Sequence, residues 1–151
     1  MSVDDPRKVL RGLHEALNKR DLDKVTSFFA DDIVGTSPEG IWKGKAENRR
    51  YFEWMFKSAA DNKVTDVRLV EKAMYAQGNV VTHVYSMEGT AKNGKLNVPC
   101  VAVIEVKDGK ITHAQIYYDR LTLAKQIASG VVATRAINAV VNQMEKGLRK
   151  A

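Results

Sequence analysis

Apolar positions in the first third of the chain recur with the spacing of α-helices. From Val9 to Leu17 they recur with helical spacing, and the helix is expected to start at Asp5–Pro6, where an aspartate and a proline favour a first turn, and to run up to Asn18. A second, shorter helix is expected after Asp21, with its end near Ala30–Asp32, and a third from about Lys45 to Ala60. A short strand is expected between the last two, at Ile33–Thr36.

From Lys63 onward the pattern changes to that of extended chain. Four strands are expected at Val64–Met74, Val80–Gly89, Leu96–Lys107 and Lys110–Tyr118. Short segments with glycine, asparagine or aspartate join them, as in β-hairpins. Helices followed by a run of hairpin-linked strands predict an α+β domain, with the helices on one face of a curved, largely antiparallel sheet.

The tail from Val131 to Ala151 has an apolar side and a basic or polar side, which predicts an amphipathic helix. We expect residues 1–127 to form the α+β domain and residues 128–151 a helical extension. Because large aromatic anchors are missing from the extension, we expect it to pack on its own domain or on a dimer partner rather than on a membrane surface.

Composition narrows the class of protein. The net charge is +6 and the pI about 9.4, but the basic residues are spread along the chain and form no stripe interleaved with aromatic residues. We therefore expect no nucleic-acid partner. The apolar runs are shorter than the roughly 20 residues that span a bilayer, so we expect no membrane partner either. The single cysteine, Cys100, cannot form an internal disulfide, which favours a reducing, cytoplasmic location.

Several short motifs, taken in their order, resemble the SnoaL-like branch of the nuclear-transport-factor-2-like superfamily. They are Asp21–Asp23, Phe28–Asp32, Trp42–Lys45, Asp108–Ile111 and Tyr117–Asp119. The resemblance implies a cone-shaped domain in which three N-terminal helices and a bent sheet, antiparallel or mixed, enclose a deep pocket. It also implies a homodimer, usually formed through the sheet. Members of this superfamily include isomerases, polyketide cyclases, epoxide hydrolases and dehydratases, alongside binding proteins, so fold alone leaves the function open.

The acidic catalytic residues of these enzymes are not found at the positions that match by eye. The carboxylate of a ketosteroid isomerase corresponds to Ser37, which cannot accept a proton in that role. The charged set of the epoxide hydrolases corresponds to His83, Tyr85 and Ile116, and the acid of the cyclases also falls near Ile116.

With the strands in that register, one set of alternating side chains forms the wall of an apolar pocket with a few polar groups, typical of a small-molecule site. The expected ligand-binding residues are Ser37, Trp42, Tyr51, Trp54, Met55, Met87, Val98, Cys100, Ala102 and Ile116. A small hydrophobic ligand is the expected partner.

Four residues are the candidate catalytic groups. His83 titrates near neutrality and is the candidate general acid or base, while Tyr85 and Tyr118 are candidate hydrogen-bond donors to a substrate oxygen. Asp119 can orient His83 or act itself, or it can cap the helix that follows. His83 can equally be a core histidine that is satisfied by a tyrosine hydroxyl or a carbonyl oxygen.

Other chemistry has less support. His14 is interpreted as a packed or half-exposed side chain, and Cys100 as a buried thiol. The histidines and the cysteine lack metal-type spacing, and no glycine-rich phosphate loop follows a strand, so neither a metal nor another cofactor is expected.

Two hypotheses of different classes follow. The first is a cofactor-free enzyme that acts on a hydrophobic, oxygenated small molecule by acid–base catalysis. The second is a non-catalytic ligand-binding or dimerisation module on the same fold. A basic interaction domain that uses the tail helix is a third and weaker reading.

Overall fold

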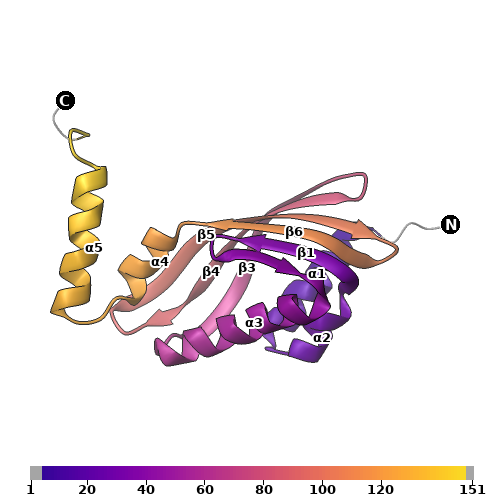
Figure 1. The fold of residues 1–151 in the computed structure, drawn as a ribbon, viewed down its shortest axis with the longest axis horizontal. Helices are drawn as coiled ribbons and strands as arrows, with labels where there is room; N and C mark the ends of the chain where they lie inside the picture. The colour runs from indigo at the N-terminus through magenta and orange to yellow at the C-terminus, as the bar shows by residue number, and fades with distance from the viewer. Residues whose placement is uncertain (1–4, 149–151) are drawn as a thin grey trace.

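Six strands form a single sheet, and the N-terminal helices lie on one of its faces (Figure 1). The computed structural model describes residues 5–148. The helices are α1 (Pro6–Asn18), α2 (Leu22–Ser27), α3 (Gly44–Asp61), α4 (Arg120–Ile127) and α5 (Val131–Met144). The strands are β1 (Phe29–Ser37), β2 (Gly40–Lys43), β3 (Thr65–Gln77), β4 (Val80–Ala91), β5 (Gly94–Lys107) and β6 (Lys110–Tyr118). The α+β fold expected from the sequence is confirmed.

The helices begin where the sequence indicated. The side chain of Asp5 accepts a hydrogen bond from the Arg7 amide at the start of α1, and Asp21 accepts one from the Lys24 amide at the start of α2. One face of α1 is buried against the sheet, with Leu10 and Leu13 at 1% and 5% exposure. Burial of this stripe holds the helix in place, because a helix of this length is marginal on its own.

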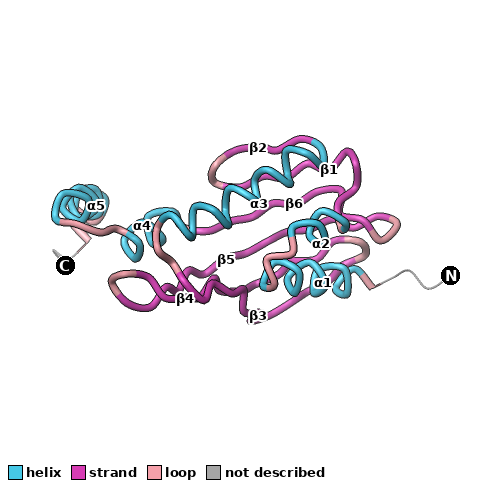
Figure 2. The backbone as a smooth tube through the Cα atoms, turned by 90° about the horizontal axis from the view of Figure 1, so that it is seen from below, coloured by secondary structure: helices cyan, strands magenta, loops and turns pink. Residues whose placement is uncertain are grey.

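The sheet has the strand order β2-β1-β6-β5-β4-β3. All neighbouring strands are antiparallel except β1 and β6, which are parallel. The three hairpins from β3 to β6 are therefore the predicted meander, and β1 with β2 extends it past β6 (Figure 2). The sheet is mixed.

One local expectation was wrong, and one strand was not predicted. The second helix ends at Ser27, so Phe29–Asp32 belongs to strand β1. Gly40–Lys43, directly before α3, forms strand β2. The apolar pair Phe28–Phe29 fits either period. Pairing decides the outcome: Ile111 donates its amide proton to the Phe28 carbonyl, and Phe29 becomes 2% exposed opposite Ile111.

A β-bulge lies between β5 and β6. Glu105 pairs with His113 and Val106 with Ile111, so Thr112 is an extra residue in β6. As a result Ile111 is fully buried, although His113, two residues on, is exposed. Beyond the bulge, Ala114, Ile116 and Tyr118 face the helices.

Helix α5 stands away from the sheet at the far side of α4 (Figures 1 and 2). Within it and the turn that follows, Ile137, Val141 and Glu145 are shielded, and the other described positions are exposed. Little of this helix is covered by its own domain, and its packing on a partner subunit stays a prediction. None of the described helices is both long and apolar enough to span a membrane.

Candidate functional site

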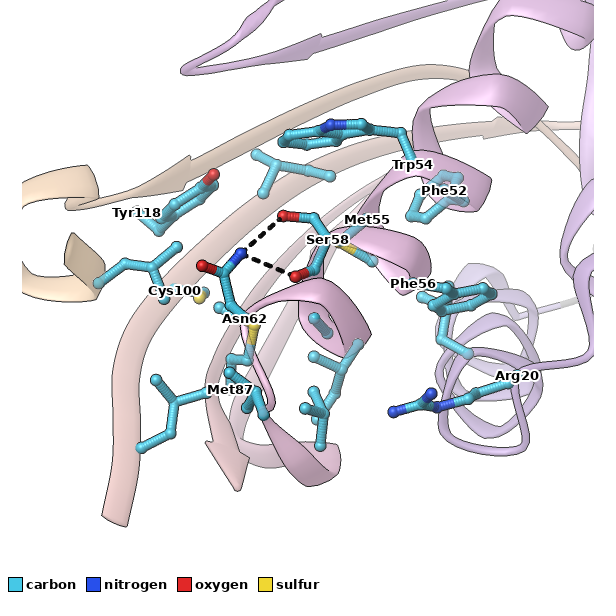
Figure 3. A pocket seen from close by; sticks show the side chains of 18 of the residues that line it. Arg20, Phe52, Trp54, Met55, Phe56, Ser58, Asn62, Met87, Cys100 and Tyr118 are labelled. Carbon is cyan, nitrogen blue, oxygen red and sulfur yellow. Dashed lines mark hydrogen bonds between the residues drawn. The ribbon is translucent and has the colours of Figure 1, made fainter. Parts of the chain in front are cut away.

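A cavity of about 140 Å³ lies between α3 and the inner face of the sheet (Figure 3). Helix α3 gives it a roof of large side chains, because one side of that helix carries aromatic and methionine residues at helical spacing. The lining includes Tyr51, Phe52, Trp54, Met55, Phe56, Tyr85, Met87, Leu96, Cys100, Ile116, Tyr118, Leu123 and Ile127. Most of this surface is apolar, as in sites that bind small organic molecules.

The cavity brings together most of the residues that the sequence placed in the pocket wall. Eight of them line it: Tyr51, Trp54, Met55, Tyr85, Met87, Cys100, Ile116 and Tyr118. Ser37, Trp42 and Ala102 instead line a smaller interior cavity of about 30 Å³, and Val98 is fully buried in the core. The alternation of β4, β5 and β6 therefore predicted the inward face.

Three tyrosine hydroxyl groups are among the polar groups of the cavity, which is also lined by Asn18, Arg20, Ser58 and Asn62. Burial raises the pKa values of Tyr51, Tyr85 and Tyr118 above the ordinary tyrosine range. The nearby Glu39 carboxylate raises those of Tyr51 and Tyr118 further. All three phenols consequently keep their protons at neutral pH and act as hydrogen-bond donors.

Glu39 is the functional candidate that the sequence reasoning missed. The Tyr118 hydroxyl donates a hydrogen bond to its Oε1, and the Tyr51 hydroxyl lies 3.4 Å from Oε2. The Arg120 Nε is 3.8 Å from Oε1, and the Glu39 side chain is only 12% exposed. A carboxylate is therefore held at the edge of the cavity by two of the tyrosines that line it.

The turn between β1 and β2 positions this carboxylate. The Ser37 hydroxyl accepts hydrogen bonds from the Glu39 amide and from the indole Nε1 of Trp42, each at 3.3 Å. Ser37 thus stabilises the turn, and the acid stands two residues later. The sequence did contain a signal for this residue: Glu39 is the only acidic residue of the turn Ser37–Gly40, which directly follows a predicted strand.

Glu39 also borders an open cleft of about 500 Å³ on the outer side of Tyr51 and Trp54. Tyr51 stacks on Trp42 with ring centroids 5.2 Å apart, and these rings separate the cleft from the smaller interior cavity. Glu39 is therefore reached from the cleft and bonded to the wall of the main cavity.

His83 faces inward, as expected, but does not line the main cavity. It is fully buried beneath α1, where its Nδ1 lies 3.1 Å from Nε2 of His14. Its Nε2 has no hydrogen-bond partner among the described residues and is 3.7 Å from Oε2 of Glu71. Burial lowers the pKa of His83, although the Glu71 carboxylate partly opposes the shift.

The remaining candidates have structural contacts. Asp119 caps α4, since its carboxylate accepts hydrogen bonds from the Leu121 amide at 2.8 Å and the Thr122 hydroxyl at 2.7 Å. Cys100 lines the cavity, and its thiol donates to the Val98 carbonyl at 3.3 Å. Burial raises the pKa of the Cys100 thiol to about 11, which disfavours a nucleophilic thiolate. Within residues 5–148, no three His, Cys, Asp or Glu side chains are grouped so that they could hold a metal ion.

Known structures share this architecture. A crystal structure of a ketosteroid isomerase-like fold from Catenulispora acidiphila, in complex with trimethylamine, superposes with a TM-score of 0.66 at 19% identity, over 78% of this chain and 90% of that one. TerC co-crystallised with polyporic acid gives 0.70 at 20% identity, over 82% and 98%. A putative polyketide cyclase from Xanthomonas campestris gives 0.69 at 21% identity, over 82% and 96%. At these identities the likeness establishes the fold.

Sequence comparison gives the family. No curated protein matches the chain significantly. The profile of the family described as SnoaL-like domain matches residues 10–114, which run from α1 to the middle of β6 and include Glu39, Tyr51 and Tyr85. The chain therefore belongs to the SnoaL-like domain family and has the NTF2-like cone fold.

Proposed function

We propose that this protein is an enzyme that acts on a hydrophobic, oxygenated small molecule by acid–base catalysis, without a cofactor. The reaction class is an isomerisation, cyclisation, dehydration or hydrolysis. The observation that carries the proposal is the Glu39 carboxylate, bonded to the Tyr118 and Tyr51 hydroxyls at the edge of an apolar cavity.

Each group has a distinct role in this proposal. Glu39 accepts a proton from the substrate and returns it, which is the work of a general base and acid. Tyr85 lines the cavity without bonding to Glu39, and its hydroxyl donates a hydrogen bond to the substrate oxygen that gains negative charge. Tyr118 and Tyr51 orient the carboxylate. Because most of the lining is apolar, these hydrogen bonds are stronger than they would be in water.

Glu39 replaces His83 as the candidate general base. The imidazole of His83 lies outside the cavity lining and interacts with His14 and Glu71. Asp119 is bonded to the start of α4, so we assign it a capping role. Tyr85 keeps the role expected of it, as a hydrogen-bond donor to a substrate oxygen, whereas Tyr118 donates to Glu39 instead.

The solved structures support the choice of a small-molecule ligand. One protein of this fold was crystallised with trimethylamine and another with polyporic acid. A ring compound with carbonyl or hydroxyl oxygens fits the mixture of apolar wall and phenol donors in this cavity.

Deuterium exchange tests the proposed chemistry without knowledge of the product. The protein is incubated in D₂O with a panel of lactones, enones and polyketide-like ketones, and NMR follows exchange at carbon next to the carbonyl. Epoxide opening is assayed in parallel. We expect catalysed turnover of at least one compound and a loss of about a hundredfold or more in Glu39→Gln.

Matched variants make the test specific. Tyr118→Phe removes the hydroxyl that bonds to Glu39 and should lower the rate, whereas Tyr117→Phe changes an exposed ring on the opposite face and should not. His83→Gln should retain activity. Full activity in Glu39→Gln, or a loss restricted to a folded His83→Gln, would overturn the assignment.

A non-catalytic binding module is the second candidate. It is favoured by one observation: Glu39 contacts the main cavity through Tyr51 and Tyr118 and does not itself line it. Ligand binding without turnover or exchange across the panel would support this reading.

We further propose a homodimer formed through the outer face of the sheet, with α5 packed on the partner subunit. Exposed aromatic side chains support such an interface: Tyr75 is 66% and Tyr117 55% exposed on the face without helices. A cytoplasmic location stays part of the proposal, and the buried, unpaired thiol of Cys100 fits a reducing compartment.

A further inference from the structure

One charged side chain reaches the main cavity. Among the described residues that line it, Arg20 is the only charged one. Figure 3 shows Arg20 and Tyr118 on opposite sides of the cavity, with the guanidinium directed toward the space between them. The cavity thus has a phenol end and a cationic end, and the side chains between them are mostly apolar apart from Ser58 and Asn62, which are hydrogen-bonded to each other.

The backbone of Arg20 is in an unusual conformation that places this side chain. Its φ is 56°, in the left-handed region that disfavours residues other than glycine, asparagine and aspartate. It lies between Lys19, the C-cap of α1, and Asp21, the N-cap of α2, and its amide donates to the Leu17 carbonyl at 3.0 Å. Lys63 has the same φ directly after the C-cap of α3, so this conformation ends the helix, and at Arg20 it also sets the direction in which the side chain leaves the backbone.

The guanidinium of Arg20 has no ion-pair partner within residues 5–148. Six other arginines in this part of the chain have a carboxylate oxygen within 4.0 Å: Arg7, Arg11, Arg49, Arg50, Arg68 and Arg120. Arg135 is the other exception; it lies on α5, which stands away from the sheet, and it does not line the cavity. Arg20 is therefore a free cation at the rim of an apolar cavity.

We propose that Arg20 binds the carboxylate of an elongated hydrophobic ligand whose oxygenated, reacting end lies at the tyrosines. This inference rests on the proposed function and narrows its substrate class to hydrophobic carboxylic acids. A guanidinium binds a carboxylate through two parallel charge-assisted hydrogen bonds, a geometry that fixes the ligand's direction in the cavity. The net charge of +6 also attracts an anion.

Octanoate and octanol are a matched pair of probes for this site, since they share the alkyl chain and differ in the charged group. ¹⁵N-labelled protein is titrated with each and binding is followed by amide NMR. We expect octanoate to bind about tenfold more tightly than octanol, and the preference to shrink as salt is added. Octanol is the more hydrophobic probe, so equal or tighter binding of octanol would overturn the proposal.

Substitution of Arg20 separates its charge from its backbone role. Arg20→Asn keeps a residue that tolerates positive φ and removes the charge, so it should fold and lose the preference for octanoate. Arg20→Lys should keep part of it. Arg135→Asn lowers the net charge equally, away from the cavity, and should change nothing. A preference for octanoate that persists in Arg20→Asn would overturn the assignment.

The two proposals can fail separately. Glu39→Gln should bind octanoate as the wild type does, because the carboxylate anchor is at the other end of the cavity. Octanoate preference without any catalysed exchange leaves Arg20 as the anchor and removes the acid–base function. Catalysed exchange without a preference for octanoate keeps the acid–base function and removes Arg20 as the anchor.

Discussion

His14 and His83 form a buried pair whose protonation states follow from their neighbours. One nitrogen of each ring lies at the 3.1 Å contact, so one ring donates and the other accepts. If His14 Nε2 donates, the proton of His83 is on Nε2 and faces the Glu71 carboxylate at 3.7 Å, which is favourable. The opposite tautomer would turn a lone pair toward that carboxylate. The geometry favours the first arrangement, with both rings neutral.

This pair makes stability depend on pH. Burial, with a smaller effect of His83, lowers the pKa of His14 from 6.5 to about 3. The unfolded chain therefore binds a proton near pH 6.5 that the folded chain does not bind until near pH 3. The contribution of neutral His14 to the free energy of unfolding is complete above pH 6.5, and it is lost as the pH falls from 6.5 toward 3. From pH 7 to pH 5, His14 alone should cost about 2 kcal/mol.

Urea unfolding at pH 7, 6 and 5 measures this slope. The His14→Gln variant lacks the titrating ring and should lose roughly 2 kcal/mol less over the interval than the wild type. Identical slopes in His14→Gln and wild type would show that the histidine is not held neutral.

At the scale of single residues, periodicity predicted much of the site and missed its acid. Tyr85, Cys100 and Tyr118 lie on strands, where alternation decides which face each side chain takes. Glu39 lies in a turn, which has no period, and its partner Tyr118 is 79 residues away. The contact between His14 and His83 likewise spans 69 residues. Such long-range pairs depend on how the elements pack, which pattern alone does not contain.

At the scale of elements, propensity identified every helix but not every boundary. Phe29–Asp32 was assigned to a helix, and the parallel pairing of β1 with β6 made it a strand. The short β2 escaped prediction because four residues are too few to show alternation. The bulge at Thr112 moved Ile111 to the core face, a change that strict alternation excludes. Pairing with a neighbouring strand, which the pattern of a single segment does not contain, decided all three.

Asp119 joins β6 to α4, and its capping contacts predict how it responds to substitution. Asp119→Ala should lower the free energy of unfolding by about 1 kcal/mol, whereas Asp119→Asn, which also caps helices well, should be nearly neutral. Because Leu123 and Ile127 of α4 line the cavity, the alanine variant should also weaken ligand binding. Urea denaturation and the exchange assay check both effects. Loss of catalysis in a stable Asp119→Asn would instead show that the carboxylate takes part in the reaction.

At the scale of the whole molecule, the curved sheet and the three N-terminal helices explain why a cavity exists. The helices cover the inner face, α1 over β3 to β5 and α3 over β1 (Figure 2). The cavity remains between α3 and the strands. The helices-then-hairpins order of the sequence was enough to predict this layering. It did not predict the position of α5, because an amphipathic pattern shows that a face needs a partner without showing which one.

Helix α5 has two different apolar stripes. Ile137 and Val141 are shielded in the chain itself, whereas Val132, Val140 and Met144 are 83%, 51% and 72% exposed. The exposed three are spaced by multiples of four, so they lie along one side of the helix. A continuous apolar stripe left in water is unfavourable, which is why we expect the partner subunit to cover it.

Removal of residues 131–151 separates folding from assembly. Because α5 contributes little to the core, the truncated chain should unfold within about 0.5 kcal/mol of the full chain when both are monomeric. On dilution, its dimer should dissociate at a protein concentration about tenfold higher than that of the full chain, since the loss of even one buried apolar side chain weakens association. The truncated chain should therefore need more protein to remain dimeric, and light scattering across a dilution series measures the shift.

Val140→Asp should weaken the dimer as the truncation does, while Asn138→Asp, which adds the same charge at an exposed polar position, should not. An unchanged dimer in both Val140→Asp and the truncation would place the interface on the sheet alone.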